Sequence, residues 1–258
     1  MNIKTACAGL IALAMASACT SQPETTEEKV APKSQEQDII DKSIAFHGFS
    51  GLDDASLSFT FRTREYAYEN KKGMYVYTRT QSDSTGALVK DVINNDGLIR
   101  YINDEEADIT EERRAAYWRS VNSVIYFFRL PFGLNDPAVN KEYIGETDIK
   151  GKTYYEIKVT FDQEGGGEDF DDTFLYWFDK QDYSMDYFAY LYHTDGGGMR
   201  FREAINARRV NGALVQDYVN MRPEDEGIDI MTIDELYEAG ELKVLSEIIN
   251  EEVVIEQR

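Results

Sequence analysis

Four consecutive apolar segments between positions 170 and 221 constrain the fold more than any other feature of the chain. Short polar or glycine-containing breaks separate them, and the last break, Asn211-Gly212, is the residue pair most typical of a two-residue hairpin turn. The first segment, Phe174-Leu175-Tyr176-Trp177-Phe178, carries apolar or aromatic side chains on both faces of a strand. A sheet with one solvated face would instead alternate apolar and polar residues. We therefore predict four antiparallel strands that are covered on both sides or line a cavity, at 174–178, 187–192, 199–210 and 214–221.

Further strands are predicted on either side of these four, because apolar residues alternate with polar ones and turn-forming residues stand between the segments. They lie at 56–66, 73–80, 88–93, 98–102, 142–147 and 154–161, and residues 242–255 add one or two more. In segment 154–161, the alternation directs Tyr155, Ile157, Val159 and Phe161 inward and Tyr154, Glu156, Lys158 and Thr160 outward. Strands of this length and spacing favour a barrel or sandwich over a fold of alternating strands and helices.

Three helices are predicted among the strands. A short amphipathic helix at 38–46 has Gly48 as its C-cap and His47 in a capping or packing role. A short helix at 232–239 begins with a capping box. The longest helix, at 108–128, also begins with a capping box, and a wide apolar stripe covers one of its faces. That stripe consists of Tyr117, Trp118, Val121, Val124, Ile125 and Phe128. It needs a large apolar surface to lie on, and strands with two apolar faces provide one.

The N-terminus resembles a bacterial lipoprotein signal. Lys4 precedes an apolar run that is too short to remain in a membrane, and Ala16-Ser17-Ala18-Cys19 has the small residues and cysteine of a lipobox. We predict cleavage after residue 18 and anchoring to the membrane through the lipidated Cys19, at the periplasmic or the surface-exposed face of the outer membrane. An ordinary signal peptide cut nearby is the alternative. Residues 19–37 are predicted to be a disordered tether, and residues 38–258 a single domain that acts as a monomer.

Charge and motif content argue against several classes of function. The chain has 48 acidic and 27 basic residues, for a formal charge of -21. This balance argues against nucleic acid as a partner and against binding of anionic lipid head groups by the protein surface. The sequence contains no nucleophile elbow, phosphate-binding loop, zinc-binding helix motif or cysteine ligand pair. We therefore expect a protein that is not an enzyme, with no catalytic residues, no metal and no cofactor.

Two polar clusters could still carry chemistry. His47 and His193 could form a zinc or general-base site with Asp195, although turn and packing positions explain both histidines. The acidic loop 168–172 lies beside flexible glycines and could wrap a hard cation, although a solvated acidic loop is the simpler interpretation.

Arginines and aromatic residues give two further hints. Arg200, Arg202 and Arg208 are expected to point outward and pair with neighbouring acids. If their face were the concave one, an arginine could bind a carboxylate or phosphate head group. The seventeen Tyr and thirteen Phe suit walls around a ligand with a long apolar body, and a tightly packed core is the alternative.

Several aromatic motifs resemble those of an uncharacterised family of secreted Gram-negative lipoproteins, a domain of unknown function. They are Tyr117-Trp118, Phe127-Phe128-Arg129-Leu130-Pro131-Phe132, Tyr176-Trp177, Met185-Asp186-Tyr187-Phe188-Ala189-Tyr190, Arg200-Phe201-Arg202-Glu203-Ala204 and Asp217-Tyr218. This resemblance covers nearly all of residues 38–256. The order of elements is also similar to that of the Lol-type lipoprotein carriers. The second resemblance implies a mainly β fold, a strongly curved antiparallel half-barrel whose concave face is covered by the N-terminal helix and the inserted helix and holds acyl chains.

We hypothesise a lipid-anchored envelope protein that binds a lipid or another hydrophobic ligand, without catalysis, in the cavity of such a half-open barrel. The predicted cover consists of Tyr117, Trp118, Val121 and Ile125 of the inserted helix, with Leu130 and Phe132 of the following loop. The predicted wall consists of Phe59, Phe61, Val76, Phe174, Tyr176, Phe188 and Tyr190. Two alternatives stay open. One is a protein-interaction scaffold with a filled core that uses the loop 130–132 or an acidic face, and the other is a metal-dependent hydrolase that uses the acidic loop with His193.

Overall fold

The computed structural model describes residues 33–48, 55–71, 74–164, 170–225 and 227–257. The predicted signal sequence, Cys19 and residues 20–32 of the predicted tether lie outside the described residues, as do Glu168 and Asp169 of the acidic loop. No helix within the described ranges has both the length and the apolar character that a membrane crossing requires.

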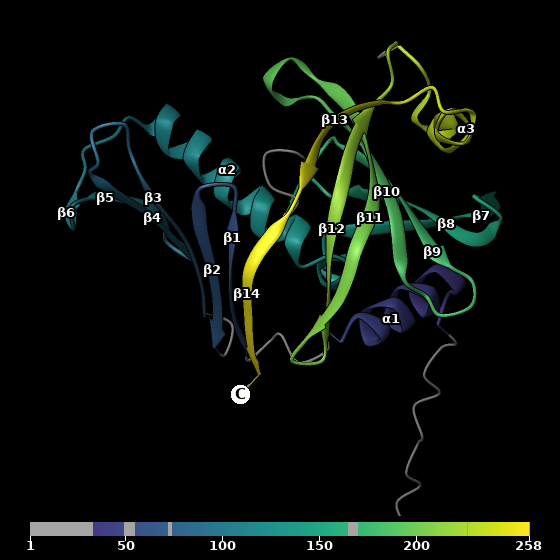
Figure 1. Cartoon of the computed structure of the whole chain (residues 1–258), viewed down its shortest axis with the longest axis horizontal. Helices are drawn as coiled ribbons and strands as arrows, with labels where there is room; N and C mark the ends of the chain where they lie inside the picture. The colour runs from purple at the N-terminus through teal and green to yellow at the C-terminus, as the bar shows by residue number, and fades with distance from the viewer. Residues whose placement is uncertain (1–32, 49–54, 72–73, 165–169, 226, 258) are drawn as a thin grey trace, which may run out of the picture. The chain divides into compact units, whose positions relative to one another are not determined.

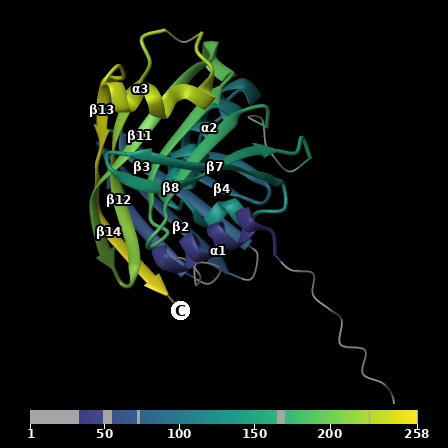
Figure 2. The ribbon, with the colours of Figure 1, turned by 90° about the vertical axis from the view of Figure 1, so that its right-hand side faces the viewer.

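Fourteen strands of the described chain form two seven-stranded antiparallel sheets (Figures 1 and 2). Sheet A has the strand order β14-β1-β2-β3-β4-β5-β6, and sheet B the order β13-β12-β11-β10-β9-β8-β7. In sheet A these are β1 Ala55–Phe61, β2 Arg64–Lys71, β3 Met74–Ser82, β4 Leu88–Asn94, β5 Gly97–Ile102, β6 Glu105–Glu106 and β14 Asn250–Gln257. In sheet B they are β7 Val139–Ile149, β8 Lys152–Phe161, β9 Thr173–Asp179, β10 Met185–Tyr192, β11 Gly198–Val210, β12 Ala213–Arg222 and β13 Lys243–Ile248. Within the described residues β6 and β7 have a strand partner on one side only, so the mainly β, unclosed fold that was predicted is confirmed.

The two sheets meet where β13 leads into β14. The chain leaves sheet B after β13, and β14 then pairs with β1 of sheet A. Asn250 holds this junction, because its backbone N–H donates to Asp217 Oδ1 (2.8 Å) and its side-chain Nδ2 donates to the Gln216 carbonyl (3.1 Å). Arg208 forms an ion pair with Asp217 at 3.1 Å. The prediction that Arg208 pairs with an acid is therefore confirmed, and the pair stabilises the seam between the sheets.

The predicted strand 56–66 is wrong at its centre. The chain turns at Arg62 and Thr63, and β1 and β2 pair as a hairpin. Arg62 adopts a positive φ of 58°, which is uncommon for a residue other than glycine. The sequence contains no Gly, Asn or Asp at this turn, so the usual turn signal is missing.

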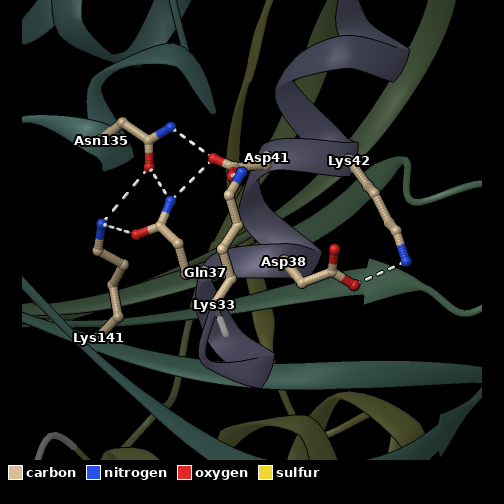
Figure 3. Close-up of polar contacts among 7 residues, drawn as sticks. All are labelled: Lys33, Gln37, Asp38, Asp41, Lys42, Asn135 and Lys141. Atoms are coloured by element: carbon tan, nitrogen blue, oxygen red, sulfur yellow. Dashed lines mark hydrogen bonds and ion pairs between the residues drawn. The ribbon is translucent and has the colours of Figure 1, made fainter. Parts of the chain in front are cut away.

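The first helix, α1 (Gln35–His47), begins three residues before its predicted start. Figure 3 shows the polar contacts that tie this first turn to the 3-10 helix η2 (Phe132–Asn135) and to β7. Gln37 Nε2 donates to Asn135 Oδ1 (2.7 Å), Asn135 Nδ2 donates to Asp41 Oδ1 (2.8 Å), and Lys141 Nζ donates to Gln37 Oε1 (2.9 Å). The last residues of the predicted tether therefore belong to the folded unit.

His47 closes α1 and packs it against sheet B. The imidazole is buried, with Nδ1 2.9 Å from the Ser43 carbonyl oxygen and Nε2 3.3 Å from Gln216 Oε1 on β12. Burial lowers the pKa of His47, because the charged form loses its hydration. Gly48 follows as the C-cap in the left-handed region (φ 74°). The predicted packing role of His47 is confirmed.

The second helix, α2 (Glu111–Phe128), lies between the two sheets and packs on both (Figure 1). On one side Ile125 is fully buried in the core of sheet A, and the Phe128 ring stacks on Phe59 with centroids 4.0 Å apart. On the other side the Phe127 ring stacks on Phe188 of sheet B at 5.6 Å. The inserted helix thus covers a large apolar surface, as its stripe predicted.

The third helix, α3 (Ile233–Ala239), covers the opposite face of sheet B. Its Tyr237 ring stacks on Phe201 at 4.6 Å, and Phe201 lies 5.6 Å from the fully buried Trp177. The strands with two apolar faces are therefore covered on both sides, as predicted. Tyr154 and Glu156 were predicted to face solvent, and this was wrong, because their strand face is buried on the side that α3 covers.

The predicted capping box at the start of α3 does not form. The Thr232 hydroxyl donates to the Asp229 carbonyl oxygen at 2.9 Å instead of accepting from the first turn of the helix. A short 3-10 helix, η4 (Ile230–Thr232), precedes α3 and places Thr232 outside the usual capping conformation. Gly240 ends the helix in the left-handed region (φ 73°), as predicted.

Candidate functional site

A cavity of about 600 Å³ lies between α2 and the face of sheet B that α2 covers. It is lined on the helix side by Ala116, Trp118, Arg119, Ser120, Asn122, Ser123, Val124, Tyr126, Phe127 and Phe128. It is lined on the sheet side by Phe61, Arg62, Phe161, Asp172, Phe174, Tyr190, Tyr192, Thr194, Arg200, Arg202, Tyr218, Asn220, Ser246, Ile248 and Asn250. Among the described residues, eight strands and the helix α2 therefore contribute side chains to one space.

Stacked aromatic rings form the apolar part of the lining. Tyr190 lies between two phenylalanines, with its ring centroid 5.2 Å from Phe127 of α2 and 5.4 Å from Phe174 of β9. The Phe161 ring meets Phe174 edge-on at 5.6 Å. Such offset and edge-to-face pairs stabilise each other and present a rigid surface to the cavity.

Two tyrosine hydroxyls meet beside this aromatic surface. The hydroxyl oxygens of Tyr126 on α2 and Tyr176 on β9 are 3.4 Å apart; Tyr176 is fully buried and Tyr126 is half-buried. Burial raises the pKa of Tyr126 to about 12 and raises that of Tyr176 well above its ordinary value. Both phenols therefore stay neutral at physiological pH and can donate hydrogen bonds.

Basic residues dominate the charge of the cavity. Among the described residues that line it are four arginines, Arg62, Arg119, Arg200 and Arg202, and one aspartate, Asp172. The balance of plus three contrasts with the formal charge of -21 for the chain. Asp172 is also engaged, since its Oδ1 accepts from the backbone N–H of His193 at 3.1 Å. An acidic protein thus carries a locally positive cavity.

Arg200 and Arg202 occupy the same face of β11, two residues apart, and both line the cavity. Arg200 Nη2 donates to the Tyr192 hydroxyl (2.7 Å), and Arg202 Nη2 donates to the Tyr190 hydroxyl (3.0 Å). The expectation that these two arginines point outward to acids is wrong, because α2 packs on their side of sheet B and Phe127 lies against the Arg202 guanidinium.

Four of the predicted ligand-binding residues line the cavity, namely Phe61, Trp118, Phe174 and Tyr190. Tyr176 and Phe188 lie beneath the lining in the fully buried core of sheet B. Leu130 is buried in the same core, and Phe132 packs against both cores.

The remaining predicted residues belong to sheet A or to the surface. Val121, Ile125 and Phe59 are buried between α2 and sheet A, and the Arg100 guanidinium stacks on the Tyr117 ring at 3.3 Å. Val76 is exposed on β3. Tyr117, Val121 and Ile125 lie outside the cavity because this part of the apolar stripe of α2 faces sheet A, whereas Trp118, Val124 and Phe128 of the same stripe line the cavity. Phe59 and Val76 belong to strands of sheet A and do not line the cavity either.

Sequence reasoning missed the polar half of the lining. Asn122 of α2, Tyr192 of β10 and Asn220 of β12 all line the cavity. Tyr192 carried a usable signal, because it continues the alternation of Phe188 and Tyr190 along one strand face. Asn122 and Asn220 carried no such signal. A polar residue in an amphipathic strand or helix normally indicates the face that is exposed to solvent.

A second cavity of about 380 Å³ lies against the first. The two share four lining residues: Trp118, Asn122, Tyr126 and Phe161. Arg129 reaches into the second cavity, with its guanidinium stacked over Tyr68 at 4.2 Å and over Phe132 at 4.8 Å. Trp118, Asn122, Tyr126 and Phe161 therefore stand between two neighbouring cavities beneath α2.

The candidates for metal chemistry do not come together. His47 is buried behind α1, whereas the His193 side chain is exposed at the end of β10. Across the part of the chain that the structure describes, no group of three or more His, Cys, Asp or Glu side chains is placed to hold a metal ion. The predicted cation loop falls partly on residues 168 and 169, outside this part.

Solved structures of low sequence identity are similar to this chain. A LolA superfamily protein from Nitrosomonas europaea is 9% identical with a TM-score of 0.48, and the match covers 87% of this chain and 92% of that one. A DUF1329 family protein from Desulfovibrio piger is 12% identical with a TM-score of 0.44, covering 75% of this chain and 89% of that one. No curated protein matches the sequence.

The sequence profile of one protein family matches residues 28–250. This range includes all three helices and every residue that lines the larger cavity. The expectation of an uncharacterised family is thereby confirmed: the chain belongs to a family of unknown function (DUF6503).

Proposed function

We propose that this protein binds a lipid or another apolar ligand in the cavity between α2 and sheet B, without covalent catalysis. The observation that carries the proposal is the open space of about 600 Å³ with stacked aromatic walls. Ligand sites are typically concave, mostly apolar, about 300–1,000 Å³ in volume and equipped with a few convergent polar groups. The cavity has each of these properties.

The alternative of an interaction scaffold with a filled core is less well supported. An open interior is what separates a binding cavity from a filled core. The loop proposed to contact a partner is also turned inward, because Leu130 and Leu134 are buried and Phe132 is half-buried between the two cores. Both observations favour the ligand-binding function.

We further propose that the protein is anchored in the cell envelope through an acylated Cys19. The small residues before this cysteine and the polar segment after it support the proposal. A Cys19→Ser variant should leave the membrane fraction, and the mass of the mature wild-type N-terminus should include acyl chains. Wild-type protein that washes off membranes with an unmodified N-terminus would refute the anchoring.

Ligand binding is tested with an uncharged fluorescent probe, N-phenyl-1-naphthylamine, which reports on apolar sites independently of charge. The wild type should enhance its fluorescence, and Asn122→Trp should abolish the enhancement, because residue 122 lines both cavities and a bulky ring there fills the shared space. The matched control is Glu112→Trp, which adds the same ring at an exposed position of the same helix.

Native mass spectrometry of protein purified from a bacterial host is the second arm. Co-purifying lipid in the wild type and its loss in Asn122→Trp would support the proposal. Absence of lipid together with no probe binding in the wild type would overturn it. Equal probe binding by the wild type and Asn122→Trp would place the apolar site elsewhere.

A further inference from the structure

Arg202 is a buried cation that pairs with no carboxylate of the described residues. Its side chain is only 9% exposed, and its guanidinium lies over the rings of Phe127 (4.2 Å), Phe188 (5.2 Å) and Tyr190 (5.4 Å). Its Nε atom is buried and has no hydrogen-bond partner among the described residues. Aromatic faces and the Tyr190 hydroxyl compensate part of the cost of burying the charge, and the guanidinium also lines the cavity.

Other arginines of the chain show what is missing. Arg79, which is similarly buried, donates to Asp91 through Nε (3.0 Å) and Nη2 (2.6 Å). Arg208, on the same strand as Arg202, pairs with Asp217 at 3.1 Å. Within the described ranges no ion pair to a carboxylate is formed by Arg202. Arg79 and Arg208 thus pair with carboxylates, whereas the Arg202 guanidinium lines the cavity without such a partner among the described residues.

Two residues next to Arg202, Arg200 and Asn220, also line the cavity. Arg200, half-buried on the same face of β11, likewise forms no ion pair with a described carboxylate and lines the cavity. Asn220 is directly opposite Arg202 on β12, and its Oδ1 is also buried without a hydrogen-bond partner in the described part of the chain. Unpaired buried polar atoms are rare, and the Arg202 Nε–H is a donor, so it indicates an acceptor group of a ligand beside it. Asn220 Oδ1 is itself an acceptor and needs a donor, such as the O–H of a singly protonated phosphate.

Resting on the proposed function, we infer that the ligand is an amphiphile with an anionic head, a carboxylate or phosphate, bound by Arg202 and Arg200, with its apolar chain along the rings of Phe127 and Phe174. Guanidinium groups bind such oxygens with short, charge-assisted hydrogen bonds, and the surrounding rings exclude the water that would weaken them. The cavity's excess of three positive charges acts in the same direction, whereas the acidic outer surface would repel the same head group.

The test compares ligands that differ only in the head. Displacement of N-phenyl-1-naphthylamine is titrated with hexadecanoate, hexadecyl phosphate and the uncharged hexadecanol, and inorganic phosphate and acetate serve as heads without a chain. Wild-type protein should bind the two anionic amphiphiles about ten- to hundredfold more tightly than hexadecanol, the range expected for hydrogen bonds to charged groups. Arg202→Met should remove most of this preference and keep the affinity for hexadecanol.

The matched control is Arg209→Met, which removes the same charge from an exposed position of the same strand that does not line the cavity, and which should keep the preference. The melting temperature of the ligand-free protein distinguishes a binding role from a structural one. Removing an unpaired buried charge should leave it unchanged or raise it in Arg202→Met. A lower melting temperature with an undiminished anionic preference would show that Arg202 serves the fold and would overturn the inference.

The remaining outcomes separate the inference from the proposed function. Equal binding of hexadecanol and hexadecanoate by the wild type would overturn the anionic head and leave the apolar site intact. Binding of neither would overturn both. Stabilisation by inorganic phosphate that disappears in Arg202→Met, without any binding of the amphiphiles, would assign the arginines to a free anion and would refute the amphiphile.

Discussion

Glu156 should make this protein less stable as the pH rises from acid to neutral. The carboxyl group lies on β8 beneath α3, is 7% exposed, and has one oxygen, Oε1, that is buried without a hydrogen-bond partner in the described residues. Burial, with a smaller contribution from the Asp234 carboxylate on α3, raises the pKa of Glu156 from its ordinary 4.5 to about 7. The folded protein thus holds a neutral carboxyl group where the unfolded chain has a carboxylate.

The sign and size follow from proton linkage. Below about pH 4.5 Glu156 is protonated in both states and contributes nothing to the pH dependence. Between pH 4.5 and about 7 the unfolded chain loses the proton first, so the free energy of unfolding decreases as the pH rises. At about 1.4 kcal/mol for each pH unit, the decrease reaches about 3 kcal/mol and stays constant above pH 7. For a domain of this size that corresponds to about 6–12 °C in melting temperature.

Glu156→Gln removes the titrating group while keeping the shape of the side chain. Its free energy of unfolding should match that of the wild type at pH 4.5 and exceed it by up to about 3 kcal/mol at pH 8, as measured by urea denaturation at both pH values. The control is Glu247→Gln at an exposed position of β13. Its free energy of unfolding should differ from that of the wild type by the same small amount at pH 4.5 and pH 8. The reasoning is refuted if Glu156→Gln is no more stable than the wild type at pH 8, or if its advantage is equally large at pH 4.5.

Two further substitutions test the sheet A core and the end of α1. Asp91→Asn should cost about 3–5 kcal/mol in urea denaturation, because it leaves the Arg79 guanidinium buried without its counter-charge; a loss below about 1 kcal/mol, the size expected of a solvated surface pair, would contradict this. Gly48→Ala should lower the melting temperature more than Gly86→Ala does. Both glycines have positive φ, but an added Cβ at position 48 would lie 2.5 Å from the Gly212 carbonyl oxygen, whereas nothing lies within 4 Å at position 86. Equal losses would show that backbone conformation alone sets the cost.

Much of the architecture could be predicted because it depends on short-range patterns. The Asn211-Gly212 turn, the alternating strands around it and the inserted helix all follow from side-chain periodicity and local turn chemistry. The helix was predicted at 108–128 and begins at Glu111, because Thr110 and not Asp108 is its N-cap. The hairpin at Arg62 escaped prediction because its turn has no glycine, asparagine or aspartate. The pairing of β14 with β1 was not predicted either. It joins the two ends of the domain, and local sequence patterns do not indicate which distant strands pair.

The candidate site was predicted in its aromatic part and missed in its polar part. Phe174 and Tyr190 follow from strand alternation, and both line the cavity. The apolar stripe of α2 correctly predicted that Val121 and Ile125 are buried, but they face sheet A. Asn122, outside the stripe, faces the cavity. A helix placed between two surfaces can turn its most apolar side to either one, and hydrophobic periodicity gives no preference between them.

Composition and periodicity were thus enough to establish a mainly β protein with aromatic strands covered on both faces, because burial of apolar surface depends on residue type and spacing alone. The positive charge of the cavity depends instead on contacts between distant segments. Arg202 and Arg208 lie on one strand, yet Arg208 meets Asp217 at the seam of the sheets while Arg202 lies under α2 beside unpaired Asn220 Oδ1. The pairing of the strands decides which arginine meets an acid and which lines the cavity without one among the described residues. Distances between residues that are far apart in the chain cannot be read from sequence order.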